Sequence, residues 1–489
     1  MSPADILTRL FIQLFILILK GWWIILPLVL LYYASEAWRY YKYEEKRLGT
    51  KWVLLEIKIP RGIMKTPEAM ERVFAGLHGP YDPPKEFNDV YLNIKIRLNY
   101  SFEIVGQEGS TRFYIYCPKA WRNLVEAQIY GQYPEVMISE AEDYAKFGPK
   151  NFPSDEYEIW GLEMQFMKED AYPILTYKEY KSLVPGDEEK WKVDPLSAIS
   201  ESFAKLHPGE QLWYQILARP CGTPGKTSAK DKWQEAGQAL VDKLAGKEKP
   251  KVDPWWKPYT EIASALVEEI PEHFKELASP GSSSGEQGLG RLSASTKKED
   301  AKREPSKMLH STPGEKTVIE AIEQKIGKLG YECIVRLVYI GRKDVFDHSH
   351  IATIFAIIQQ FNTRNLNGFR LNSATMTKRK NYFWGFYRSR RFELNTKNSL
   401  LYFYRKRSPF WDFKKVLPLP VASRFSRIIS GLFYRLFPNQ IEYMRSKTLV
   451  LNIEELATMF HFPGETVSSP TMPRMESKQG GPPINLPVG

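Results

Sequence analysis

The alternation of apolar and polar positions between residues 51 and 138 predicts six elements in succession. Runs rich in β-branched and aromatic residues predict strands, and stretches with apolar residues at helical spacing predict helices. Thr66, followed by Pro67 and Glu68, is typical of a helix N-terminus. The order is strand, helix, strand, strand, helix, strand, over residues 51–59, 66–77, 97–105, 111–116, 118–130 and 135–138. This order is the ferredoxin-like pattern.

A weaker pattern of the same kind follows. Strands are predicted at 159–167, 211–219, 331–340, 382–387 and 400–404. Helices are predicted at 196–205, 229–244, 317–329 and 349–361. Since the strand and helix over 331–361 resemble the opening over 51–77, we expect an internal duplication.

The chain begins with an almost wholly apolar stretch, Phe11–Tyr33, long enough to cross a bilayer. Lys20 lies within it, so either this lysine extends toward the headgroups, or residues 6–19 lie in the interface and the span runs over 22–38. The predicted membrane residues are Trp22, Trp23, Ile24, Leu28, Leu31, Tyr32 and Tyr33.

Basic residues after this stretch predict a single pass through the cytoplasmic (inner) membrane with a cytosolic C-terminal body. The alternatives are a cleaved signal peptide, with its cleavage site near residues 34–37, and a buried core helix. The predicted fold class is therefore α+β, an N-terminal transmembrane helix followed by repeated ferredoxin-like βαββαβ-type units.

Composition shifts divide the chain into seven segments. Residues 280–316 are rich in Ser, Gly, Lys and Glu and predict a flexible linker, and the Pro/Gly-rich end predicts an extended tail. The segments are a membrane anchor (1–45), a first ferredoxin-like α+β domain (46–150), a second α+β domain (151–279), the linker (280–316), a third, basic α+β domain (317–410), an amphipathic helical segment (411–462) and the tail (463–489).

The chain has 489 residues and a formal net charge of +11. This balance favours an acidic partner, either nucleic acid or an anionic membrane surface. The three cysteines, Cys117, Cys221 and Cys333, are far apart and lack metal-site spacing, which argues against a disulfide framework and favours a reducing compartment.

No complete catalytic or metal site emerges from the sequence, so we expect neither an enzyme nor a cofactor. Residues 220–227 resemble a phosphate-binding loop, but Pro220 stands where the motif needs glycine, which favours an ordinary Gly/Pro loop with a solvent-exposed lysine. His348 and His350 are two imidazoles without a third ligand, which is a weak zinc signal.

The region from Arg342 to Lys447 interleaves basic clusters with aromatic residues. Basic side chains can follow phosphates and aromatic rings can stack on bases, so DNA contact is one interpretation. Core aromatics with solvated arginines are the other. The candidate nucleic-acid-binding residues are Lys378, Arg379, Lys380, Arg388, Arg390, Arg391, Arg405, Lys406 and Arg407. Residues 421–437 predict a basic amphipathic helix, bound either to an anionic membrane or to the protein's own core.

The stretch Val450–Pro463 reads VLNIEELATMFHFP, and Ser477-Lys478 and Pro482–Pro487 follow it. Asn452 before Glu454 and Glu455 predicts a helix N-cap with acids in the first turn, and a helix to about His461. These motifs resemble the segment just before the motor domain in type IV secretion and conjugation ATPases of the HerA–FtsK class, in the membrane-anchored versions of candidate-phylum (Patescibacteria) bacteria. The motifs Leu54–Ile57, Lys65–Met70 and Tyr116–Pro118 add to the resemblance.

In such ATPases a P-loop motor follows this segment, whereas here no nucleotide-binding residue of the family has a counterpart. The resemblance therefore implies a non-catalytic, membrane-anchored component of a translocation system that docks a HerA–FtsK-class P-loop ATPase in trans and guides DNA. Membrane lipid and further copies of the chain are the other expected partners. The implied motor-docking residues are Asn452, Glu454, Glu455, His461 and Pro463. The alternative function is a stand-alone membrane-tethered nucleic-acid-binding module.

Overall fold

Together with single residues between 23 and 43, the computed structural model describes residues 45–60, 65–83, 88–92, 95–179, 194, 196–222, 232–246, 312–377, 386–407 and 447–463. Contacts divide the chain into two compact units, residues 1–238 with 317–489, and residues 239–316. All strands of the sheet belong to the first unit.

The first half of the sheet follows the predicted order of elements. Its strands are β1 (Trp52–Lys58), β2 (Tyr100–Gln107), β3 (Ser110–Pro118) and β4 (Met137–Glu140). Between β1 and β2 lie α2 (Pro67–Leu77) and η1 (Asn88–Leu92), and between β3 and β4 lie η2 (Lys119–Trp121) and α3 (Arg122–Gln132). The strands lie in the order β4-β1-β3-β2, and each pairing is antiparallel. The six elements predicted between residues 51 and 138 are therefore confirmed.

The second half repeats this arrangement after η3 (Tyr144–Lys146). Its strands are β5 (Tyr157–Phe166), β6 (Glu210–Cys221), β7 (Gly330–Arg342) and β8 (Phe369–Leu371). Its helices are α4 (Ser197–Ala204) before β6 and α9 (Ser349–Gln359) after β7. The order β6-β7-β5-β8 again puts the first and third strands of the unit at the centre.

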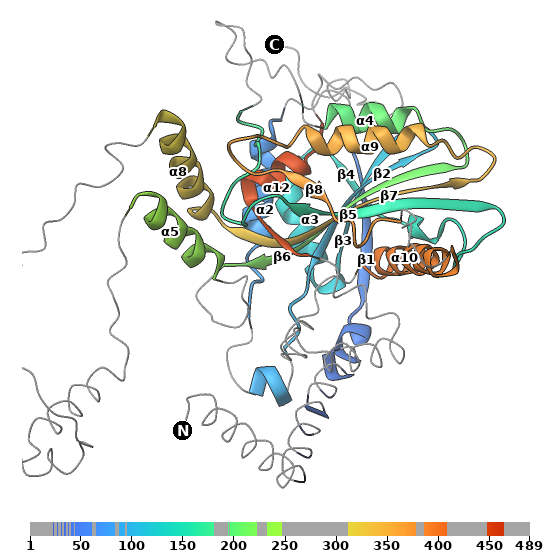
Figure 1. Ribbon diagram of the computed structural model, residues 1–489, viewed down its shortest axis with the longest axis horizontal. Helices are drawn as coiled ribbons and strands as arrows, with labels where there is room; N and C mark the ends of the chain where they lie inside the picture. The colour runs from blue at the N-terminus through green and yellow to red at the C-terminus, as the bar shows by residue number, and fades with distance from the viewer. Residues whose placement is uncertain are drawn as a thin grey trace, which may run out of the picture. The chain divides into compact units, whose positions relative to one another are not determined.

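The two halves share one sheet, because the edges of β2 and β6 pair along eight residues, from Tyr100↔Ala218 to Gln107↔Gln211. This pairing satisfies backbone groups that two separate sheets would leave open. A ninth strand, β9 (Leu449–Asn452), pairs with β7 and leads into α12 (Ile453–Met459). Strands from all three predicted α+β domains and from the segment 411–462 therefore form one nine-stranded sheet (Figure 1).

Helices cover both faces of the sheet. The larger core lies under α2, α3, α4, α9 and α12, which contribute buried residues such as Phe74, Ile129, Phe203, Ile357 and Leu456. The opposite face carries α10 (Phe386–Lys406), and Figure 1 shows α4 and α9 across the sheet from it. Leu400, Leu401 and Tyr404 of α10 pack on Val105, Trp213 and Val338 of the sheet.

The α+β part of the predicted fold class is confirmed, but its transmembrane helix is wrong. In the part of the chain that the structure describes, no helix is both long enough and apolar enough to cross a membrane. The longest of these helices, α10, has 21 residues but carries charged side chains along its length. The two βαββαβ units share one sheet through the pairing of β2 with β6.

The strand predicted at 400–404 is wrong, because α10 occupies residues 386–406. Of the strand predicted at 382–387, residues 386 and 387 are helical as well, and residues 382–385 lie outside the described part. Aromatic residues favour strands, which suggested a period of two. The buried positions instead recur at helical spacing, at Thr396, Lys397, Leu400, Leu401 and Tyr404. Short apolar runs do not distinguish the two periods.

The internal duplication has a different register from the expected one. Since β7 and α9 are the third strand and second helix of their unit, their counterparts are β3 and α3 rather than β1 and α2. A long connection joins β6 to β7, in the position of a hairpin turn, and contains α5 (Trp233–Leu244) and α8 (Pro313–Ile326). Most of the predicted linker 280–316, the amphipathic helix at 421–437 and the tail from residue 464 lie outside the described residues.

Candidate functional site

A row of buried polar side chains crosses the face of the sheet beneath α10. Alternate residues of each strand point to this face, and Glu103 of β2, Gln215 of β6, Arg336 of β7 and Glu163 of β5 lie directly opposite one another in the register. All four are at most 3% exposed. A charged row at this depth is stable only where its members are paired.

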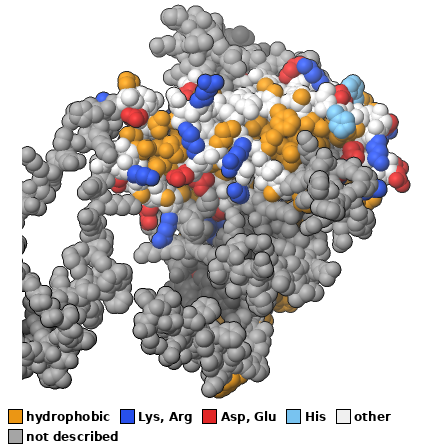
Figure 2. Space-filling model, in the orientation of Figure 1, with side chains coloured by type: hydrophobic (Ala, Val, Ile, Leu, Met, Phe, Trp, Pro, Cys, Tyr) orange, Lys and Arg blue, Asp and Glu red, His pale blue; other side chains and the backbone are white. Residues whose placement is uncertain are grey.

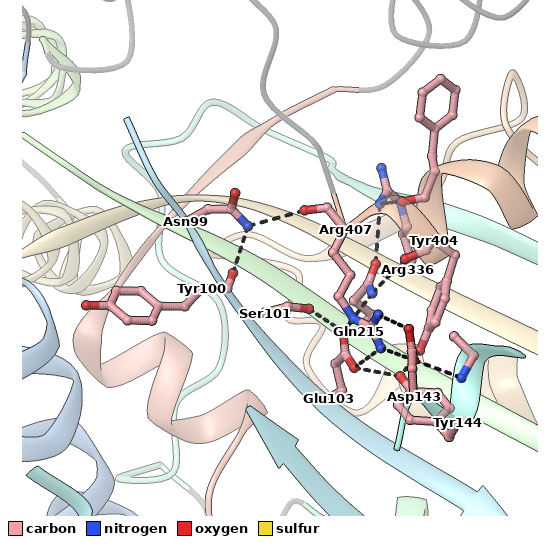
Figure 3. A network of polar contacts seen from close by, with 12 residues as sticks. Asn99, Tyr100, Ser101, Glu103, Asp143, Tyr144, Gln215, Arg336, Tyr404 and Arg407 are labelled. Carbon is pink, nitrogen blue, oxygen red and sulfur yellow. Dashed lines mark hydrogen bonds and ion pairs between the residues drawn. The ribbon is translucent and has the colours of Figure 1, made fainter. Parts of the chain in front are cut away.

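The row is closed by Arg407, which follows the last residue of α10 (Figure 3). Arg407 donates to Glu103 from Nε at 2.8 Å and from Nη2 at 3.1 Å. It also donates to both carboxylate oxygens of Asp143, at 2.9 and 2.8 Å. Its guanidinium lies 4.6 Å from the ring centroid of Tyr116. One guanidinium thus holds two carboxylates and an aromatic face, which is the geometry that favours arginine over lysine.

Glu103 is the acceptor at the centre of this cluster. Besides Arg407, it accepts from Ser101 Oγ at 2.5 Å, from Gln215 Nε2 at 2.9 Å and from Tyr144 Oη at 2.8 Å. Because Tyr144 gives its proton to Glu103, Tyr404 donates to Tyr144 across 2.7 Å. Both carboxylate oxygens of Glu103 are therefore satisfied, by donors from β2, β6 and η3 and by Arg407 after α10.

The same row satisfies the end of α10. The last carbonyls of a helix lack partners within the helix. Arg336 Nη1 donates to Phe403 O at 3.1 Å, and Gln215 Nε2 donates to Tyr404 O at 3.3 Å. Arg336 Nε also donates to Glu163 at 2.8 Å. The guanidinium charge next to the C-terminus of α10 is favourable for the helix dipole.

The electrostatics of the cluster favour the charged forms of Asp143 and Arg407. Burial opposes ionisation of Asp143, but the hydrogen bonds and the charge of Arg407 outweigh it and lower the pKa of this carboxyl. Burial also opposes the charge of Arg407, and Glu103 and Asp143 nevertheless raise its pKa well above the usual value. Burial raises the pKa of the Tyr144 and Tyr404 phenols. The cluster therefore consists of stable ion pairs and neutral phenols. Such groups can hold α10 on the sheet, but they are poorly suited to transferring protons.

The predicted nucleic-acid-binding residues are spread over different surroundings. Arg390 is exposed, and Lys406 lies over the ring of Tyr402. Arg405 and Arg407 are tied to the protein itself, Arg405 by donating to the carbonyls of Ala145 and Phe147. The structure does not describe Lys378, Arg379 and Lys380, nor the side chains of Arg388 and Arg391. Direct DNA contact at these positions stays a prediction.

The predicted motor-docking motif forms β9, α12 and the residues after them. The expected N-cap is confirmed, since Asn452 Oδ1 accepts from Glu455 N at 2.8 Å and Glu455 accepts from Asn452 N at 2.9 Å. Glu455 is fully buried and pairs with Lys325 at 3.0 Å, and His461 lies 3.0 Å from Asp194. Glu454 pairs with Lys178 and Lys328 nearer the surface. Pro463 is buried.

The structure also describes some of the predicted membrane residues, the start of the phosphate-loop-like stretch and the three cysteines. Trp23 and Leu31 are 63% and 67% exposed, and the remaining predicted membrane residues lie outside the described part. Pro220 and Cys221 end β6 and are paired with β7, while residues 223–227 of the loop are not described. All three cysteines are free, which confirms the absence of a disulfide framework.

One group of side chains that could hold a metal is not apparent from the sequence. Ligand atoms of His207, Glu210 and His350 lie within 4.8 Å of one another. His350 was noted with His348, but the ligands that join it come from a turn and a strand about 140 residues earlier. No motif spacing connects them, so only the fold reveals the group.

Comparison with known proteins identifies a family. No curated protein and no solved structure matches the chain. A family model described as a domain of unknown function, DUF8128, matches residues 42–398. The match includes β1 to β8, and it ends before Arg405, Arg407 and β9. The chain belongs to the DUF8128 family.

Proposed function

We propose that the protein is a non-catalytic docking component of a type IV secretion or conjugation-like translocation system, with a HerA–FtsK-class P-loop ATPase as its partner. The proposal starts from the resemblance of residues 450–463 to the segment before the motor in those ATPases. The observation that carries it is that β9 and α12 are built into the sheet and its larger core. A partner bound beside α12 is therefore held in a fixed position relative to the whole sheet.

A charged depression beside α12 is the best candidate for the docking surface. It has a volume of about 370 Å³ and is lined by Glu68, Glu71, Arg72, Ala75, Tyr177, Lys178 and Ile453. The Arg72 and Lys178 side chains are 66% and 49% exposed, and each already has an acidic neighbour within the fold. Interleaved charges of this kind favour specificity and association rate more than affinity.

Binding between the full-length chain and the HerA–FtsK-class ATPases encoded in the same genome tests this function. We expect the double variant Arg72→Glu, Lys178→Glu to lower the association rate about tenfold, since it reverses two exposed charges on the surface. Lys205→Glu is the matched control, because this lysine at the end of α4 is 68% exposed and lies outside the depression. Failure of the wild-type chain to bind any of these ATPases would contradict the proposal.

The described residues give less support to nucleic-acid binding. Two of the nine candidate basic residues, Arg405 and Arg407, use their guanidinium groups to hold the fold together. Their contribution to a phosphate-binding surface would require breaking contacts within the protein. We therefore propose docking as the function and keep DNA guidance as a secondary role of the same component.

A further inference from the structure

Three side chains meet where α4, β6 and α9 come together. His207 lies in the turn between α4 and β6, Glu210 is the first residue of β6, and His350 lies in the first turn of α9. Glu210 Oε2 lies 3.4 Å from His207 Nδ1 and 3.6 Å from His350 Nε2. Figure 2 shows histidine side chains at the surface beside a patch of hydrophobic side chains on the described part of this face.

These distances fit a common metal ion. Zinc binds imidazole nitrogen and carboxylate oxygen at about 2.0–2.2 Å in tetrahedral geometry, so neighbouring ligand atoms lie about 3.3–3.5 Å apart. The two separations from Glu210 are close to this value. Two histidines and one glutamate also form a known set of zinc ligands that leaves the fourth position open.

His350 gives an independent indication of a missing ligand. Its side chain is only 10% exposed, and its Nε2 atom has no hydrogen-bond partner among the described residues. A buried polar atom in this condition calls for an explanation, such as an ion. The atom faces the carboxylate of Glu210, which is fully buried.

The surroundings support the proposed ligands. Tyr339 donates from its hydroxyl to Glu210 Oε1, whereas Oε2 is the oxygen measured against both histidines, and Tyr339 accepts from Asp347 N at 2.9 Å. Outer hydrogen bonds of this kind orient the residues that bind metals. The carboxylate of Asp347 adds negative charge near His350, while the nearby Arg342 is paired with Asp344 at 2.9 Å.

We propose that His207, Glu210 and His350 bind one Zn²⁺ ion, with the fourth position open to solvent beside the exposed His207. The ion would tie the turn before β6 to the start of α9. Because the ligands come together only in the folded chain, zinc binding stabilises the fold. The site is independent of the proposed docking surface, and its test does not depend on a motor.

Calorimetric titration of the metal-stripped full-length chain with ZnCl₂ tests the site, with thermal unfolding as a second measurement. We expect one zinc ion per chain and an increase in Tm on zinc addition. His207→Ala should weaken binding about 100-fold or more, and since His207 is 72% exposed this variant should fold normally. Tyr339→Phe should weaken binding about 10–100-fold by removing only the outer hydrogen bond.

His348→Ala is the matched control, because His348 is an exposed histidine two residues from His350 and outside the proposed ligand set. It should bind zinc like the wild type. Equal zinc binding by the wild type and the His207→Ala and His350→Ala variants would overturn the proposal. So would the absence of stoichiometric binding.

Discussion

Arg407 joins the end of α10 to two other parts of the fold. It is 2% exposed and has a φ of +47°, a backbone conformation uncommon outside glycine. That conformation ends the helix and directs the guanidinium toward Glu103 and Asp143. The cost of the backbone conformation is offset by the charged hydrogen bonds that it makes possible.

Replacing Arg407 tests this role. Arg407→Met leaves Glu103 buried beside a residue that cannot pair with it, so we expect the free energy of unfolding to fall by about 3–5 kcal/mol. Arg390→Met, on an exposed position of the same helix, should produce no measurable change. Urea denaturation of the two variants measures the difference, and equal stabilities would show that the cluster contributes little.

The sequence did not reveal the buried polar row. Gln215 and Arg336 lie within strands whose residues are almost all buried on both faces, so no alternation marks them as a set. Arg407, which pairs with Glu103 at one end of the row, belongs to a basic cluster that resembles a nucleic-acid-binding surface. Only the register of β2, β6, β7 and β5 places the row in line.

At the scale of elements, the strands and helices whose ends are marked by characteristic residues were predicted well, whereas α10 was not. β1, β3 and α2 have boundaries marked by Pro, Gly or Thr, and α12 has a capping box. α10 combines aromatic residues that favour strands with a helical burial pattern. Its contact with the sheet overrides the local preference of its residues.

The close approach of α10 to β5 depends on Gly161. A Cβ added there would lie 2.6 Å from Leu337 O and 2.7 Å from Leu400 Cδ2 of α10. We expect Gly161→Ala to destabilise the protein by about 1–3 kcal/mol, because a strand carbonyl has little room to move. Gly131→Ala in α3 is the control of opposite sign. Nothing lies within 4 Å of its added Cβ, so it should stabilise the helix by about 0.5–1 kcal/mol in thermal or urea unfolding.

At the scale of the whole sheet, the sequence indicated two similar βαββαβ units, but it did not indicate that they pair into one sheet. The sequence of an edge strand does not indicate which strand it pairs with, because the hydrogen bonds between strands are made by backbone groups that almost every residue has. The eight-residue pairing of β2 with β6 is therefore visible only in the structure. It also places both units over one large core that includes Phe102 of β2 and Tyr214 of β6.

A shared sheet and core predict that the two halves unfold together. Phe102 is fully buried in β2, and Phe102→Ala should cost about 3–5 kcal/mol. If unfolding is cooperative, native-state hydrogen exchange should show the same loss of protection in β3 of the first half and β7 of the second. Tyr130→Ala, at a 41% exposed position of α3, should leave the hydrogen-exchange protection of both β3 and β7 unchanged. A loss confined to β1 and β3 would show instead that each half is its own folding unit, joined at β2 and β6 without energetic coupling.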